Sequence, residues 1–111
     1  MPAHPGRFGI GLCEFVNNGA DFSDVFVVEK LNGGSRPGEN ERAAEFAKSK
    51  SYQGIGGSDS HFVSAIGTCL TAFPKTINSE QELVQALNQQ GFHPVHLEET
   101  RQAPTSSRSL L

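Results

Sequence analysis

The stretch DVFVVE, residues 24–29, decides the fold class of this chain. It is short, β-branched and continuously apolar between its two acidic ends. Such a run is typical of a strand that is covered on both faces, as in a parallel sheet. The turn residues of Leu31-Asn32-Gly33-Gly34 end it. We therefore expect a buried strand here, and the elements around it set the architecture.

Helical and extended patterns alternate after this strand. A helix is expected from Glu39 to Ser49, because Ala43, Phe46 and Ala47 recur at helical spacing. The segments 53–56 and 69–73 read as short strands, and Pro74 stops the second one.

A second helix is expected to begin at Ser79, which forms a capping box with Glu82. It runs to about residue 90 and stops at Gly91, and a last strand covers 92–97. This order predicts an α/β fold with a mostly parallel sheet. Residues 1–97 then form the domain, and the polar residues 98–111 are expected to be a disordered tail.

Composition narrows the class of protein. The chain has 111 residues and a net charge of −3, so nucleic acid and anionic membranes are not expected partners. The sequence has no signal peptide and no run of ~20 apolar residues, which predicts a soluble, cytoplasmic protein without a membrane segment. Cys13 and Cys69 lack close-spaced partners and are expected to be buried rather than bridged.

The stretch GGSDSHF, residues 57–63, holds the first candidate site. Asp59 and His61 are two residues apart, so in extended backbone both side chains would point the same way and could bind zinc, manganese or iron. The same residues could instead form a polar turn in which Asp59 caps local amides. Spacing alone leaves both interpretations open and favours the turn.

His4 is the second candidate. Proline restricts the residue before it, so the Ala3-His4-Pro5 segment predicts that His4 ends an extended segment. A single histidine near a terminus is by default a solvated surface residue, and that interpretation also stays open. His93 and His96 fall on opposite faces of a strand and are interpreted as structural or solvated.

The order of four segments adds a resemblance. AHPGR (3–7), VVEKLNG (27–33), GIGGSDSHFVSAIGTCLTAF (54–73) and SEQELVQALNQQG (79–91) follow one another as in the C-terminal half of a PHP domain. This is the polymerase and histidinol phosphatase family of metal-dependent phosphoesterases. The resemblance implies a partial distorted (β/α)7 TIM-like barrel, of which this chain supplies only C-terminal strands and helices.

The resemblance also implies a site. His4, Asp59 and His61 match metal ligands of the family, and the metal ions would activate a water that hydrolyses a phosphorylated small molecule. No catalytic residue beyond the ligands is expected. Arg7 is a candidate phosphate contact or a solvated arginine, and Glu29 and Asn32 are candidates to orient the ligands from the barrel mouth.

The family's first strands, with their H-x-H ligand motif, have no counterpart in this sequence. Whether the chain is an enzyme is therefore left open. We expect a phosphoesterase that is incomplete as this chain alone and needs a second chain to complete the barrel. The alternative is a non-catalytic remnant or an interaction module with a PHP-like fold.

Overall fold

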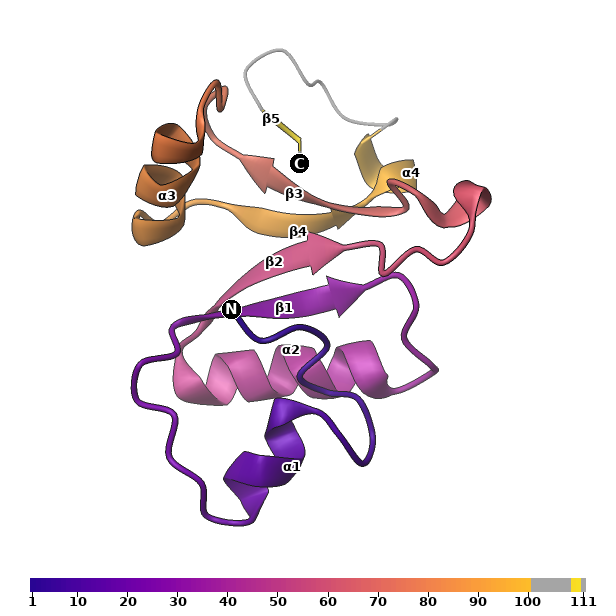
Figure 1. The fold of residues 1–111 in the computed structure, drawn as a ribbon, viewed down its shortest axis with the longest axis vertical. Helices are drawn as coiled ribbons and strands as arrows, with labels where there is room; N and C mark the ends of the chain where they lie inside the picture. Colours follow the sequence, from indigo (N-terminus) through magenta and orange to yellow (C-terminus); the bar gives the residue numbers. More distant parts are fainter. Residues whose placement is uncertain (101–108, 111) are drawn as a thin grey trace.

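The computed structural model of the chain describes residues 1–100 and 109–110. It is a mixed α/β structure built from small sheets and short helices (Figure 1). The elements in chain order are α1 (Leu12–Asn17), β1 (Val27–Asn32), α2 (Glu39–Lys50), β2 (Gln53–Gly57), the 3₁₀ turn η1 (Val63–Ala65), β3 (Cys69–Phe73), α3 (Glu80–Asn88), β4 (His93–His96), α4 (Leu97–Thr100) and β5 (Ser109–Leu110). No helix in these described residues is long and apolar enough to cross a membrane.

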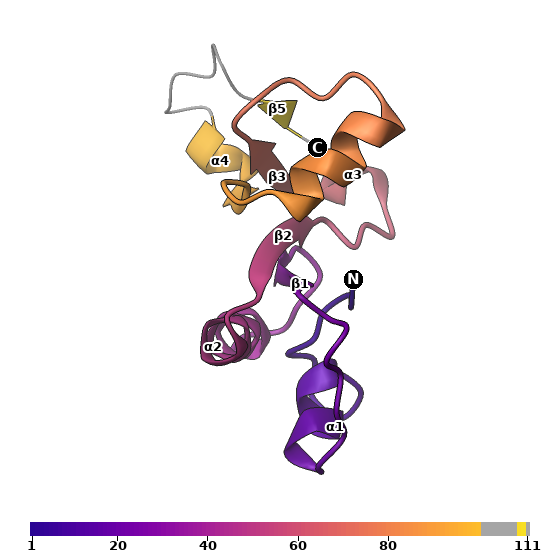
Figure 2. The same ribbon diagram turned by 90° about the vertical axis from the view of Figure 1, so that its left-hand side faces the viewer.

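Strands β1 and β2 form a parallel pair, and α2 packs against β1 (Figures 1 and 2). Acidic residues in the first turn of α2 and lysines in its last turn complement the helix dipole. The pairing register shifts between Glu29 and Leu31, so Lys30 is the extra residue of a β-bulge. The bulge turns the last part of β1 relative to its first part.

The second sheet has the order β4-β3-β5 and is antiparallel. The expectation of a mostly parallel sheet is therefore wrong for this half of the molecule. Helix α3 lies at the end of β3 (Figure 1), so β4 starts opposite Ala72, near where β3 finishes. A parallel return would need a helix that carries the chain back along the whole strand.

Strand β2 of the first sheet contacts β3 and β4 of the second, and Thr71 hydrogen-bonds across this junction. The buried Thr71 hydroxyl of β3 donates to the Gly56 carbonyl (3.1 Å) and accepts from the Gly56 amide (2.9 Å). A Cβ on Gly56 would collide with the Leu70 carbonyl oxygen, so only glycine allows this approach. Val27, Phe73 and Phe92 form the core cluster, which Leu83 and Leu87 of α3 help to cover.

Most sequence-predicted elements are present within one to three residues of their expected ends, and the serine half of the capping box at Ser79 is confirmed. Glu82 accepts from the Asn78 amide rather than from Ser79. Helix α1 and η1 were not predicted. Strand β5 and all of the short helix α4 except Leu97 lie within the segment expected to be a disordered tail, and the rest of that segment, residues 101–108 and 111, lies outside the described residues.

Candidate functional site

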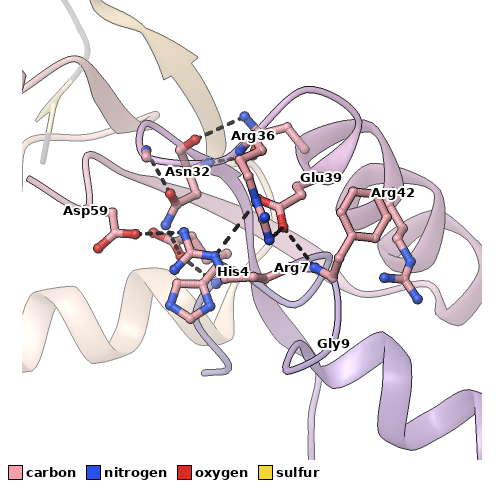
Figure 3. A network of polar contacts seen from close by, with 12 residues as sticks. His4, Arg7, Gly9, Asn32, Arg36, Glu39, Arg42 and Asp59 are labelled. Carbon is pink, nitrogen blue, oxygen red and sulfur yellow. Dashed lines mark hydrogen bonds and ion pairs between the residues drawn. The ribbon is translucent and has the colours of Figure 1, made fainter.

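Three chain segments end at the same edge of the β1–β2 pair. The Glu29 amide donates to the Pro2 carbonyl (3.0 Å), which fixes the N-terminal segment beside β1. The Gly33 amide donates to the Gly57 carbonyl (2.9 Å), which ties the loop after β1 to the end of β2. His4, the loop after β1 and Asp59 therefore lie side by side (Figure 3).

Glycines make this close approach possible. A Cβ on Gly33 would lie 2.7 Å from the Ser58 carbonyl oxygen, and one on Gly34 would lie 3.1 Å from Oδ2 of Asp59. A Cβ on Gly57 would collide with the Glu29 carboxylate. Gly33 is therefore required where the Ser58 backbone packs on it, and Gly34 and Gly57 leave room for the carboxylates of Asp59 and Glu29.

Glu29 and Asn32 connect the segments. Both are buried, and the bulge at Lys30 brings them to the same side of β1, where the Asn32 Nδ2 donates to Glu29 Oε2 (3.0 Å). The same carboxylate oxygen accepts from the His4 amide (2.7 Å), and Asn32 Oδ1 accepts from the Gly34 amide (2.8 Å). These two side chains hold the backbone at His4 and at the loop after β1.

His4 does not end an extended segment, which corrects the expectation from Pro5. Its φ is +29°, in the left-handed region, and it lies in a bend. The bond from its amide to Glu29 stabilises this sparsely populated conformation. The Nδ1 atom of His4 is buried and has no hydrogen-bond partner, the only such side-chain atom among the described residues. A buried polar atom without a partner is uncommon and points to a missing ligand or contact.

Asp59 is also outside extended backbone, with φ +51°, so the simple alternation of side chains does not apply to it. Its Oδ2 accepts from Nη2 of Arg7 at 3.0 Å (Figure 3). This bond lowers the pKa of the Asp59 carboxyl, with smaller contributions from an Asn32 hydrogen bond and the nearby His4, while burial opposes the shift. Asp59 is therefore an ionised carboxylate at neutral pH, and Arg7 is the cation that pairs with it.

His61 is brought near Asp59 but points outward. Its side chain is 79% exposed, and Nδ1 lies 2.8 Å from the main-chain oxygen of Asp59 and 4.0 Å from Oδ1. A carbonyl oxygen only accepts, so Nδ1 carries the proton in this geometry and Nε2 holds the free lone pair of the neutral ring. Asp59 and His61 therefore lie in a polar loop in which Asp59 bonds to Arg7, and their role as metal ligands stays a prediction.

Glu39 is a buried carboxylate at this edge that the sequence analysis missed. It is 1% exposed and accepts from the Arg36 and Phe8 amides, both at 2.8 Å. These bonds lower the pKa of Glu39. Its Oε1 also lies 4.0 Å from Nε of Arg7, so Arg7 sits between two carboxylates. The only sequence signal was Arg36 three residues ahead of a helix-opening glutamate.

These groups surround an open cavity of about 320 Å³. Its lining is mainly charged and polar: Arg7, Gly34, Arg36, Glu39, Asp59 and His61. A phosphate group would meet two guanidinium groups there, which suit phosphate oxygens, and two carboxylates, which repel them.

The remaining histidines lie elsewhere. His93 and His96 are exposed on β4, and His96 Nδ1 is 3.6 Å from the Sγ of the buried Cys69. Cys13 and Cys69 are both buried.

The edge has the donor types that a divalent metal prefers, a carboxylate and imidazoles. However, no three His, Cys, Asp or Glu side chains of residues 1–100 and 109–110 converge as a metal site. Arg7 occupies one Asp59 oxygen and His61 is turned to solvent. As arranged, these residues do not fit a bound metal ion.

Comparison with known proteins gives one match. Residues 37–90 match a family model described as PHP-associated, which supports a PHP-domain-related region in this part of the chain. The matched range includes Asp59 and His61 and begins after His4, Arg7, Glu29 and Asn32. Neither the search of curated proteins nor that of solved structures found a match.

Proposed function

We propose that this chain, whose residues 37–90 are related to PHP domains, carries one edge of a metal-dependent phosphoesterase centre. In this proposal the chain contributes part of a distorted (β/α)7 barrel, and the remaining ligand-bearing strands come from residues outside these 111. The enzyme hydrolyses a phosphate ester of a small molecule in the cytoplasm.

The observation that carries the proposal is the convergence of His4 and Asp59 at one strand edge with a buried, unpartnered imidazole nitrogen. These residues lie 55 positions apart in the sequence. Burying a ring nitrogen without a hydrogen bond costs about 1–3 kcal/mol, so a structural role alone does not account for it. A cation or a group from a second segment would supply the missing partner.

The roles of this chain's residues follow from their contacts. Glu29 and Asn32 position His4 and the loop that carries Gly34. Asp59 supplies negative charge and His61 an exposed imidazole. Arg7 and Arg36 line the cavity in which a phosphate group would bind. Bound metal ions would supply the activated water and the charge that stabilises the transition state.

A second chain is the proposed source of the missing ligands. Beside His61, the apolar side chains of Phe62, Val63 and Ile66 are 68%, 85% and 65% exposed. Large apolar side chains gathered on one loop mark an interaction surface more often than a solvated one. Their place next to the proposed site suits a partner that completes it.

The test is hydrolysis of p-nitrophenyl phosphate with added Mn²⁺, first by the isolated chain and then after mixing with a polypeptide that carries an H-x-H ligand motif. We expect no turnover by the isolated chain and turnover by the mixture. Asp59→Asn should lower the mixture's rate by at least about 100-fold, since a carboxylate ligand cannot be replaced by an amide without loss of metal charge balance.

His61→Ala should also lower the mixture's rate, and His93→Ala is its matched control, because both histidines are exposed and only His61 lies at the proposed edge. Robust turnover by the isolated chain would reject the missing-ligand part of the proposal. Full activity of the Asp59→Asn mixture would reject the site. If the chain binds the second polypeptide but the mixture does not hydrolyse the ester, the result would favour the interaction module.

A further inference from the structure

Two apolar cavities adjoin where strand β1 begins. The first has a volume of about 250 Å³, and its lining includes Val25, Phe26, Val27, Val84 and Leu87. The second has a volume of about 330 Å³, and its lining includes Ile10, Leu12, Phe15 and Phe22. Met1 lines the first and Pro2 the second, so the two cavities share a wall. Together they form one surface, which we call the apolar groove.

Large apolar side chains of the groove are exposed to solvent. The exposed fractions lie between 52% and 68% for Met1, Ile10, Phe15, Phe26 and Val84. Helix α3, which carries Val84, has no buried residue. Exposed apolar side chains that gather on one surface mark an interaction site more often than a solvated face.

The groove is separate from the edge that holds Asp59. Val27, the first residue of β1, lines the groove, whereas Asn32, the last residue of β1, belongs to the Asp59 edge. Figure 1 shows α3 beside the start of β1 and the loop after β2 at the other end of the strand. An inference about the groove therefore goes beyond the proposed function and does not depend on it.

The side-chain charges around the groove are all negative. Lysine, arginine and histidine are absent from the segments that line it, residues 1–3, 10–12, 15–28 and 80–88. The α-amino group of Met1 is the positive group in these segments. Asp21, Asp24 and Glu80 are exposed and form no ion pair with another described residue. Asp24 lines the groove, and Glu80 is one helical turn before Val84 on α3. Basic side chains of a partner would meet complementary charge here.

The elements around the groove suit a helix as its occupant. In two views the N-terminal residues lie between α3 and α1 (Figures 1 and 2), so the groove extends from one helix towards the other. Strand β1 contributes Val27 alone to the described lining, so the groove offers no strand edge for main-chain pairing. The occupant must then satisfy its own amides and carbonyls, as a helix does.

We propose that the apolar groove binds an amphipathic helix of a partner polypeptide, with large apolar residues on one face and Lys and Arg beside that face. Burial of the apolar face supplies the affinity. Asp21, Asp24 and Glu80 select a basic helix over an acidic one and speed association. Phe26 of the loop before β1 and Val84 of α3 are the principal apolar contacts.

The experiment measures binding of a fluorescein-labelled peptide to the full 111-residue chain by fluorescence anisotropy. The peptide consists of Leu and Lys over about 18 residues, or five helical turns, patterned as an amphipathic helix. Two comparison peptides are used, one with Glu in place of Lys and one with the same composition scrambled so that no apolar face forms.

The protein variants test the groove and its charge separately. Phe26→Asp and Val84→Asp place a carboxylate in the groove, and Phe62→Asp is their matched control, because that ring is 68% exposed at the other end of the molecule. Asp24→Asn/Glu80→Gln removes two negative charges from the groove. Its matched control is Glu41→Gln/Glu45→Gln, which removes the same charge from exposed positions of α2. Circular dichroism verifies that each variant is folded.

We expect the Leu/Lys peptide to bind at least about tenfold more tightly than either comparison peptide. Phe26→Asp and Val84→Asp should each weaken its binding by at least about tenfold, and Phe62→Asp by less than about twofold. An added carboxylate attracts a basic peptide, so this loss reports the apolar contact. Asp24→Asn/Glu80→Gln should weaken binding about three- to tenfold at low salt and reduce its salt dependence, unlike the α2 control. Val84→Asp serves alone if Phe26→Asp does not fold.

Several results would overturn the inference. They are absence of peptide binding, equal binding of the acidic or the scrambled peptide, and equal losses in Val84→Asp and Phe62→Asp. Analytical ultracentrifugation of the chain alone tests a second copy as the occupant. Dimerisation that Val84→Asp abolishes and Phe62→Asp preserves would assign the groove to a second copy and overturn the partner helix. None of these results bears on the proposed phosphoesterase function, which is tested by hydrolysis.

Discussion

The two ends of strand β1 are stabilised by different physics. At its start, Val27 packs with Phe73 and Phe92 in the apolar core cluster. At its finish, Glu29 and Asn32 hold the His4 segment and the glycine loop by directional hydrogen bonds. Burial of apolar area depends little on direction, whereas each hydrogen bond of the polar end needs its own geometry.

The difference shows in the backbone. Near the polar end two non-glycine residues, His4 and Asp59, have positive φ. Strained residues of this kind persist only where surrounding contacts hold them, and they concentrate at functional sites. The apolar end thus provides stability, and the polar end uses part of it to hold a particular arrangement of charges.

The prediction with the largest expected effect concerns the apolar end of β1. Phe73→Ala should lower the free energy of unfolding by about 3–5 kcal/mol, because it opens a cavity where the ring is 2% exposed. Urea denaturation measures the change. Phe62→Ala is the control, since that ring is 68% exposed and should cost less than about 0.5 kcal/mol. Equal losses in the two variants would contradict the contrast between core and edge.

A smaller effect is expected at the polar end. Glu29→Gln should cost about 1–2 kcal/mol, because a neutral amide is a poorer partner for the His4 amide and the Asn32 side chain. It should also move the NMR signals of the His4 ring, which Phe73→Ala should leave in place while the protein is folded. Glu45→Gln, at an exposed position of α2, is the control. Unchanged NMR signals of the His4 ring in Glu29→Gln would show that Glu29 does not position this residue.

The smallest effect is a change in acid sensitivity. The pKa of Glu39 is lowered in the folded chain, so its contribution to stability is full above the unfolded carboxyl pKa of about 4.3 and is lost as the pH falls through the lower folded pKa. The Glu39→Gln variant should therefore be less stable than the unmodified chain at neutral pH and should lose less stability on acidification. Urea denaturation at about pH 6 and about pH 3 measures how much free energy of unfolding each protein loses on acidification. An equal loss in the variant and the unmodified chain would show that other carboxylates control acid unfolding.

Local signals predicted the elements well. Helix α2 and strand β3 were expected nearly where they lie. Apolar spacing and the breakers Gly33 and Pro74 are signals that extend over only a few neighbouring residues, so the sequence shows them directly. Helix α1 was missed although Leu12, Phe15 and Val16 have helical spacing, because the helix has only six residues and no side chain caps its start. Its position depends on burial of Cys13 and on the ion pair between Glu14 and Arg42, whose residues are far apart in sequence.

The candidate site was predicted only as a set of residues. The sequence named His4, Asp59, Glu29 and Asn32, and the structure brings them to one edge. It did not predict the conformations of His4 and Asp59, because simple strand alternation fails where φ is positive. Glu39 was missed because Arg36 three residues ahead is a weak signal and the burial of Glu39 depends on the distant Phe8 segment.

The amino-acid sequence by itself determined where helices and strands form and which residue types stand at their ends, because propensity, capping and turn chemistry act over a few residues. Only the tertiary structure decided that β4 runs antiparallel to β3, that the bulge at Lys30 joins Glu29 to Asn32, and that Arg7 pairs with Asp59. Those outcomes depend on which distant segments pack together, and therefore on the balance of burial, hydrogen bonding and charge over the whole chain.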